Sequence, residues 1–138
     1  MDCRNGEKNP MDDFAVAGSI NKKIFAEGLG FECPDNMYLL GYVTDEEAKT
    51  LMRDCKAFLF PSFYEGFGIP PLEAVSAGAK KVVVSDIPVM HEIFGETANY
   101  INPVKNEKIS VLHDIQRDVL NKYAWSLSAK KMQELLWQ

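Results

Sequence analysis

Residues 61–74, PSFYEGFGIPPLEA, combine the residue types of this chain that are best suited to binding chemistry. Seven residues, two of them glycines, lie between the glutamates Glu65 and Glu73. Glycine lets the backbone come close to a ligand and leaves N–H groups free to donate to it. Pro70-Pro71 predicts the start of a helix, and a helix N-terminus carries a partial positive charge. The segment therefore predicts a binding site for an anion such as phosphate.

The two glutamates predict a second kind of recognition beside this anion site. Glu65 is expected in the loop, and Glu73 at the end of the first turn of the helix that follows. A carboxylate accepts hydrogen bonds, and hydroxyl groups such as those of a sugar donate them. Two carboxylates that flank an anion site suit a ligand with both phosphates and hydroxyls, of which a nucleotide sugar is one example.

Each of these features also has a simpler explanation when it is taken alone. A loop glutamate such as Glu65 can be merely solvated, and Glu73 can be a favourable charge in a first helical turn. Gly66 and Gly68 can shape a turn without binding anything. The neighbouring aromatic side chains fit a hydrophobic core. The order and spacing of the whole segment, rather than any one residue, favour a ligand site.

Short apolar runs that alternate with helix-period segments predict the elements that position this loop. Strands are expected at 14–17, 37–40, 57–60, 82–84 and 99–101. Such alternation predicts an α/β fold, in which a doubly wound parallel sheet of about five strands carries helices on both faces. Ligands of such sheets bind beyond the carboxyl ends of the strands. Residue 61 directly follows a predicted strand, so the loop lies where a ligand is expected.

The remaining elements have local signals of their own. Thr44–Glu47 has the pattern of a capping box, and the strand at 57–60 is apolar on both faces, as an interior strand should be. Ser85-Asp86 can cap a short helix through residues 88–94. Apolar residues at helical spacing predict further helices with these stripes: Ala48, Leu51, Met52 and Cys55; Leu112, Ile115, Val119 and Tyr123; Ala129, Met132, Leu135 and Leu136.

Composition narrows the classes of protein to which the chain can belong. Of its 138 residues, 46% are hydrophobic and 25% charged, as expected for one globular domain. The formal net charge of −5 argues against nucleic acid as the main partner. Cys3, Cys33 and Cys55 form no CxxC pair, so neither a disulfide framework nor a zinc site is expected. We expect reduced thiols, a cytoplasmic location and no membrane span, since a span needs about 20 apolar residues.

Several segments, in order and in register, resemble retaining glycosyltransferases of the GT4 type, which have the two-domain GT-B fold. The resemblance rests on the E-x7-E pattern within PSFYEGFGIPPLEA, and on the flanking segments DFAVAGS, YLLGYVTDEEAKTLMRDCKAFLFPS, GAKKVVVSDIPVMHEIFGETANYINP and YAWSLSAKKMQELL. It covers about residues 12–137 and concerns the C-terminal, donor-binding half of these enzymes. It implies a Rossmann-like domain at 12–138 that is preceded by a disordered or remnant tail at 1–11.

The resemblance also implies a role for each candidate residue. Glu65 matches the glutamate that contacts the transferred sugar near the reacting centre, which makes it the catalytic candidate. Glu73 matches the glutamate that holds the ribose hydroxyls. The expected reaction is transfer of a hexose, with retention of configuration, from a UDP, GDP or dTDP sugar to a glycan or glycolipid, without a metal or cofactor. The further substrate-binding residues fall into two groups. Gly66, Phe67, Gly68 and Ile69 match the loop that cradles the sugar and the diphosphate. Tyr42 and Val43 match positions beside the base, and Leu72 matches a position near the nucleoside.

The chain departs from the family pattern near its start. The family begins this domain with a strand and helix whose loop binds the diphosphate through an arginine and a lysine. Arg4 and Lys8 resemble a remnant of that loop, and the residues between Asn9 and Phe14 are too few for the helix. We therefore expect two strands with unpaired edges, through which the chain could self-associate.

The acceptor-binding domain of the family does not match any part of the sequence, and this leaves more than one function open. The first hypothesis is a donor-binding domain that is inactive by itself, within an enzyme at the inner face of the membrane. The second is a non-catalytic subunit that binds a nucleotide sugar and needs a separate acceptor-domain chain. A nucleotide-sugar epimerase of the same architecture is disfavoured by the E-x7-E spacing with GFGIPP.

Overall fold

The computed structural model describes residues 11–18, 34–105, 108–109 and 112–136. The predicted tail at 1–11, apart from Met11, lies outside these residues, and so do Arg4, Lys8, Cys3 and Cys33. The described elements are five strands and five helices: β1 (Phe14–Ala17), β2 (Met37–Gly41), α3 (Asp45–Asp54), β3 (Phe58–Phe60), α4 (Ile69–Ala77), β4 (Val82–Ser85), α5 (Pro88–Phe94), β5 (Asn99–Ile101), α6 (Val119–Lys122) and α7 (Trp125–Leu136).

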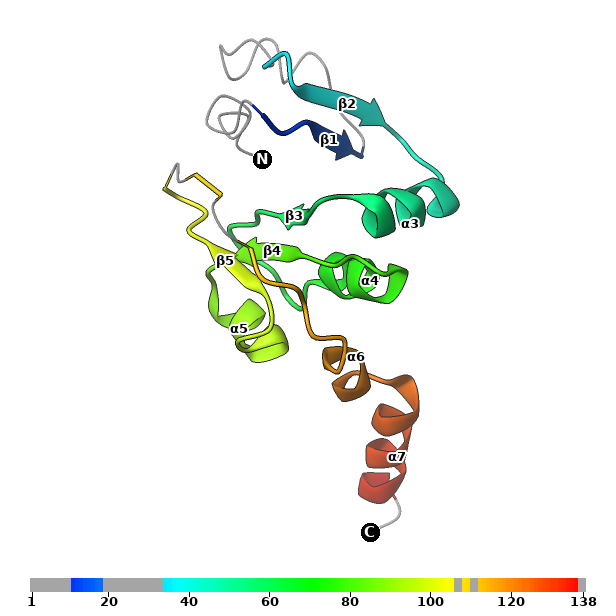
Figure 1. Cartoon of the computed structure of the whole chain (residues 1–138). Coiled ribbons are helices and arrows are strands. Elements are labelled where there is room, and N and C mark those ends of the chain that lie inside the picture. Colours follow the sequence, from blue (N-terminus) through cyan, green and yellow to red (C-terminus); the bar gives the residue numbers. More distant parts are fainter. Residues whose placement is uncertain (1–10, 19–33, 106–107, 110–111, 137–138) are drawn as a thin grey trace.

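The strands confirm the α/β class, but they form two sheets where one was expected. β1 pairs in parallel with β2, and β3, β4 and β5 form a second parallel sheet in that order. Figure 1 shows the β1–β2 pair apart from the three-stranded sheet. Among the described strands, only β4 has two neighbours, so β1, β2, β3 and β5 each have one unpaired edge, those of β1 and β3 among them. A doubly wound sheet has a strand between two such edges, and no described strand takes that place.

The position of β3 corrects the expectation that it is an interior strand. β3 is the edge of its sheet, and its residues Phe58, Leu59 and Phe60 are all only half-buried. The central strand is β4, whose four residues are fully buried. An apolar strand is therefore not by itself evidence of a central position, since β3 packs its rings against the core from one side.

The core of the domain lies between α4, α5 and the three-stranded sheet. Ala74 and Val75 of α4 meet Val82 and Val84 of β4 and Met90 of α5, all with essentially no exposed surface. Gly78 ends α4 in the left-handed conformation that glycine adopts without strain. These contacts hold α4 rigidly at the end of the loop that carries the candidate site.

Helix α3 begins as expected but buries less than expected. The backbone N–H of Thr44 donates to Glu47 Oε2 at 2.8 Å, and the N–H of Glu47 donates to Thr44 Oγ1 at 3.3 Å, which completes the capping box. The backbone N–H of Thr44 and the Thr44 hydroxyl, at 2.9 Å, both donate to Glu47 Oε2, and these two hydrogen bonds lower the pKa of the Glu47 carboxyl. The apolar stripe of α3 was expected to be buried, yet no residue of α3 is; the helix packs beside α4. Because α3 packs beside α4 while the β1–β2 sheet lies apart, the apolar stripe stays partly exposed.

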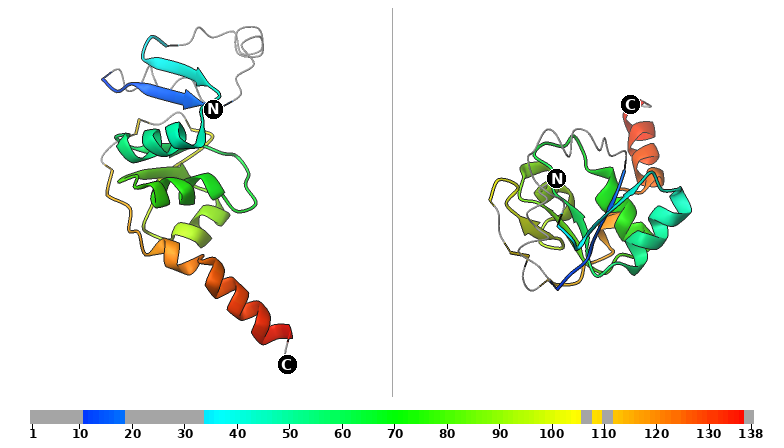
Figure 2. Two further views of the ribbon diagram at one scale, coloured as in Figure 1. Left: turned by 90° about the vertical axis from the view of Figure 1, so that its right-hand side faces the viewer. Right: turned by 90° about the horizontal axis from the view of Figure 1, so that it is seen from above.

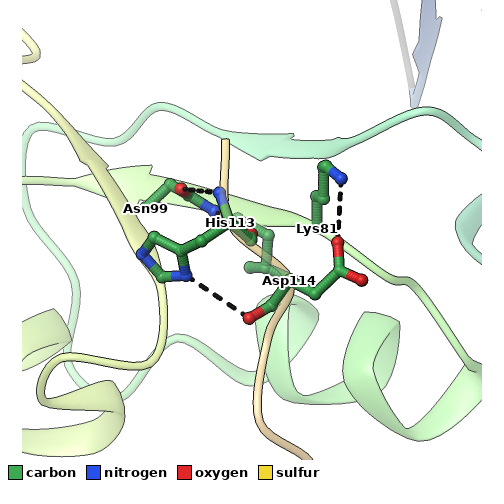
Figure 3. A network of polar contacts seen from close by, with 5 residues as sticks. Lys81, Asn99, His113 and Asp114 are labelled. Carbon is green, nitrogen blue, oxygen red and sulfur yellow. Dashed lines mark hydrogen bonds and ion pairs between the residues drawn. The ribbon is translucent and has the colours of Figure 1, made fainter. Parts of the chain in front are cut away.

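Residues 112–116 were expected to be helical and are not. The Asn99 side chain accepts from the backbone N–H of His113 at 3.0 Å and donates to its carbonyl at 3.0 Å (Figure 3). Ile115 N–H donates to the carbonyl of Lys80 at 2.8 Å. Because these backbone groups are already bonded to β5 and to the segment before β4, they cannot form a helical ladder, and α6 begins only at Val119.

The helix α7 extends away from the rest of the domain in both views (Figures 1 and 2). The side chains of Ser126–Leu136 are all exposed, including those of Met132, Leu135 and Leu136. Among the described residues, no helix is both long enough and apolar enough to cross a membrane.

Candidate functional site

The loop between β3 and α4, residues 61–68, carries the candidate site, and it is called the donor loop below because the resemblance predicts that it faces the sugar donor. Its first part is held by the neighbouring strand, because the N–H of Ser62 donates to the Ser85 hydroxyl at 2.7 Å. Ser85 is the last residue of β4 and is fully buried. The donor loop therefore leaves the sheet at the carboxyl end of β3, where the sequence predicts a ligand site.

Glu65 is half-buried, and Ser62 orients its side chain. The Ser62 hydroxyl lies 2.9 Å from Glu65 Oε1 and 3.0 Å from the Tyr64 carbonyl oxygen. The hydroxyl has one hydrogen, so it donates to one of these acceptors at a time. The other carboxylate oxygen, Oε2, has no hydrogen-bond partner among the described residues. One side of the Glu65 carboxylate is thus held in place, and the other is free to contact a ligand.

Four successive N–H groups of the segment have no protein acceptor. Within the described part of the chain, the backbone N–H groups of Gly66, Phe67, Gly68 and Ile69 donate no hydrogen bond. Gly66, Phe67 and Ile69 are exposed, so water can pair with their N–H groups, and an anion can replace that water. It contributes partial positive charge without a basic side chain.

The first turn of α4 adds less to this site than its sequence pattern suggests. The helix begins at Ile69, with Pro70 and Pro71 as its second and third residues, and proline has no N–H. Of the first three positions of α4, only Ile69 therefore presents a donor. The loop amides, rather than the end of the helix, make up most of the predicted anion site.

The two loop glycines differ in how much space a side chain would have at each position. Gly68 has φ of +79°, and a Cβ added to it would lie 2.5 Å from Met90 Cε and 3.2 Å from Met90 Sδ. Gly66 has no atom within 4 Å of such a Cβ. Gly68 is thus favoured by its left-handed conformation, and a Cβ there would force the end of the Met90 side chain to shift, whereas Gly66 leaves open space beside the free N–H groups.

Glu73 and Leu72 follow on α4 and face different surroundings. Glu73 is the fifth helical residue, so it lies just beyond the first turn rather than at its end. Its side chain is exposed and forms no hydrogen bond or ion pair with the described residues. Leu72 is half-buried against the core. Glu73 is therefore free to accept from a ligand, and Leu72 supports the turn from below.

Tyr42 and Val43 lie outside the donor loop, on the segment that joins β2 to α3. They directly follow β2 and precede the Thr44 cap, and Tyr42 is 86% exposed. No hydrogen bond or ion pair among the described residues joins either of them to residues 61–73. Since β2 belongs to the separate two-stranded sheet, their expected place beside a base remains a prediction.

Comparison with known proteins shows the family to which the chain belongs. The family model described as "Glycosyl transferases group 1" matches residues 7–133, which is most of the chain. The chain belongs to this family of glycosyltransferases. The predicted resemblance to GT4-type enzymes is thereby confirmed.

Individual relatives are similar over part of their own length. O-antigen chain mannosyltransferase B of Escherichia coli is 35% identical over 101 residues, which are 72% of this chain and 26% of that protein. O-antigen chain mannosyltransferase RfbU of Salmonella typhimurium is 44% identical over 72 residues, or 52% of this chain and 20% of the relative. Glycosyltransferase MJ1607 of Methanocaldococcus jannaschii is 28% identical over 135 residues, 84% of this chain and 34% of the relative. The chain thus spans about a third or less of these proteins.

The sequence reasoning missed a group of side chains that holds α5 in this glycosyltransferase domain. The rings of His91 and Tyr100 stack at 4.1 Å, and His91 Nε2 lies 2.7 Å from Asp86 Oδ1. The Tyr100 hydroxyl is within hydrogen-bond distance of the carbonyls of Gly95 at 2.6 Å and Met90 at 3.2 Å. Burial, together with the charges of Glu96 and Asp86, raises the pKa of Tyr100 to about 12. The group fixes α5, which carries Met90 against Gly68.

Asp86 also corrects a detail of the sequence reasoning. It was expected to cap α5, whereas the N-cap is Ile87 and makes no side-chain hydrogen bond. The only sequence signal for its contact with His91 is an aspartate five residues before a histidine, which is too common to single out.

Cys55 is half-buried, with its thiol 3.2 Å from the Met52 carbonyl, and burial raises the pKa of that thiol. The described residues contain no group of three or more metal-ligating side chains.

Proposed function

We propose that this chain is the donor-binding domain of a glycosyltransferase that moves a mannosyl group from a nucleotide sugar to a glycan or glycolipid, with retention of configuration. The observation that carries the proposal is the run of four unpaired N–H groups at 66–69 beside the half-held carboxylate of Glu65. Family membership supports sugar transfer, and the names of the relatives from Escherichia coli and Salmonella typhimurium support mannose as the sugar.

The free N–H groups suit the charge that the reaction places on the donor. Transfer breaks the bond between the anomeric carbon and a diphosphate oxygen, and forms a bond from that carbon to an acceptor hydroxyl oxygen, which loses its proton. The diphosphate leaves as an anion, and donors that already point at it stabilise the transition state. The amides of Gly66–Ile69 are the donors that we assign to this role.

The two glutamates are assigned to the sugar end and the ribose end of the donor. The free Oε2 of Glu65 would face the transferred sugar, where a carboxylate stabilises positive charge that develops on the ring. The exposed carboxylate of Glu73 would accept from the ribose hydroxyls. We assign no metal to the reaction, because the amides supply the electrostatic stabilisation of the diphosphate.

The binding of the donor can be tested by calorimetric titration with GDP, UDP, dTDP and their hexose conjugates. We expect one base to bind saturably. Loss of a hydrogen bond to a charged group costs about 1.5–3 kcal/mol, so Glu73→Ala should weaken binding about 10- to 150-fold. Glu134→Ala, which removes an exposed glutamate on α7, is the matched control and should leave the affinity unchanged. Equal affinities for the two variants would contradict the role of Glu73.

The same material tests whether the chain needs another domain. Catalysis in a closed site depends on excluding water from the donor, and we propose that a separate acceptor-binding domain supplies that closure. We expect no measurable transfer to a simple mannoside acceptor by this chain alone. Turnover by the purified chain would contradict this part of the proposal.

A second candidate function is a non-catalytic subunit that binds a nucleotide sugar and joins a separate acceptor-domain chain. The observation that favours it is the exposed apolar surface of α7, where Met132, Leu135 and Leu136 are 63–74% exposed. This surface is also expected near Trp125 and Trp137, of which the side chain of Trp125 and the whole of Trp137 lie outside the described residues. Co-purification with a second polypeptide from the native source would favour this function over the first.

A further inference from the structure

The donor loop touches the C-terminal part of the domain at one aromatic contact. The rings of Phe67 and Tyr123 lie 5.1 Å apart and almost perpendicular, at 84°. This edge-to-face arrangement brings the positive edge of one ring to the negative face of the other, so it is favoured beyond simple burial. Tyr123 directly follows α6 and is half-buried, so its ring gives Phe67 a firm surface.

Tyr123 is itself tied to α5. Lys122 Nζ donates to the carbonyl of Glu92 at 2.7 Å, and the Tyr123 hydroxyl lies 3.4 Å from the same oxygen. Glu92 is in the last turn of α5, where carbonyl groups lack helical donors and attract cations. Lys122 also lies 5.2 Å from the centre of the Tyr123 ring, a cation–π distance. The end of α6 is therefore fixed to the end of α5.

Two neighbouring residues of the donor loop thus pack on side chains that belong to α5 or are hydrogen-bonded to it. Gly68 packs directly on Met90 of α5, and Phe67 packs on Tyr123, which is bonded to Glu92 of α5. The N–H groups of these two loop residues have no acceptor in the described protein. Their directions are consequently set by packing, since no hydrogen bond of their own sets them.

We infer that Tyr123 is a positioning residue, which fixes the direction of the free amides at 66–69 through the ring of Phe67. The inference rests on the proposed function for its purpose, because those amides are the groups that would hold the diphosphate. When a loop becomes ordered only on binding, the loss of conformational entropy weakens the affinity for the ligand. A loop that Tyr123 already holds in place avoids this loss.

The test compares Tyr123→Leu, which removes the ring, with Tyr123→Phe, which keeps the ring and loses only the long hydroxyl contact. Tyr38→Leu is the matched control, because Tyr38 is a 54% exposed tyrosine on β2. The first measurement is ¹⁵N relaxation of the amides without ligand. In Tyr123→Leu we expect order parameters at 66–69 to fall from about 0.85 towards 0.6. Tyr123→Phe and Tyr38→Leu should match the original chain, and the Val75 amide should stay rigid in all four proteins.

The second measurement is the affinity of each variant for the nucleotide that the original chain binds. One aromatic pair corresponds to about a 2- to 10-fold change, so Tyr123→Leu should weaken binding by that factor and Tyr123→Phe should restore it. Unchanged order at 66–69 in Tyr123→Leu would overturn the inference. Failure of the original chain to bind any nucleotide would count against the proposed function instead, while the relaxation data would still decide the role of Tyr123.

Discussion

The substitution Gly68→Ala tests most sharply how the donor loop is built. Gly68 adopts φ of +79° and ψ of 54°, the left-handed region that other residues enter at a cost. Its missing Cβ would lie 2.5 Å from Met90 Cε, closer than real Cβ atoms approach other atoms. Met90 has no exposed surface, so its side chain cannot swing into solvent to make room.

The two effects can be given rough magnitudes. A left-handed residue other than glycine costs about 1–2 kcal/mol. An additional methyl group in a well-packed core costs about 1–3 kcal/mol. We therefore expect Gly68→Ala to lower the free energy of unfolding by about 2–5 kcal/mol. Met90→Ala in the same chain removes the collision but keeps the backbone cost, so the double variant should show a favourable coupling between the two sites.

Urea denaturation of each variant measures this loss. Gly66→Ala is the control, because a Cβ at that position meets nothing within 4 Å and its φ is not in the left-handed region. It should change the free energy of unfolding by less than about 1 kcal/mol. If Gly68→Ala proved as stable as Gly66→Ala, the packing of the donor loop on α5 would be wrong as described.

Three further predictions concern the parts that support the site. Thr44→Ala removes the capping box of α3 and should cost about 1 kcal/mol in urea denaturation, whereas Thr50→Ala, at an exposed mid-helix position, should cost much less. Asn99→Leu should cost about 2–3 kcal/mol and increase hydrogen exchange at the His113 amide, because that amide loses its acceptor; unchanged exchange would contradict the bond. The pKa of Tyr100 is raised from 10.0 to about 12, so its contribution to stability is present below pH 10 and is lost as the pH rises through 12. Ultraviolet titration should show one late-ionising tyrosine that is missing from Tyr100→Phe, and identical curves would refute the shift.

Features that depend on neighbouring residues in sequence were predicted well. The Thr44–Glu47 capping box forms as expected, because its two partners lie within one helical turn. The strand, loop and helix around Glu65 also follow from a local alternation of apolar residues, glycines and prolines. The family was recognisable for the same reason, since its motif is a contiguous segment.

Features that depend on distant partners were not predicted. Residues 112–116 have a helical apolar pattern, but Asn99, more than ten residues earlier, binds their backbone groups at the sheet edge. Likewise β3 has the composition of an interior strand and yet lies at an edge, because composition does not state how many neighbours a strand has. The contact between Phe67 and Tyr123 has no local signal at all.

The most direct test of the central claim is an amide NMR titration of this chain with GDP, UDP and dTDP and their mannose or glucose conjugates. We predict saturable shifts at the amides of Gly66, Phe67, Gly68 and Ile69 with one base, and smaller shifts elsewhere. These four groups have no other acceptor in the described structure, so they should report an arriving diphosphate first. A folded protein whose spectrum does not change with any of these ligands would contradict the claim that residues 66–69 form a donor site.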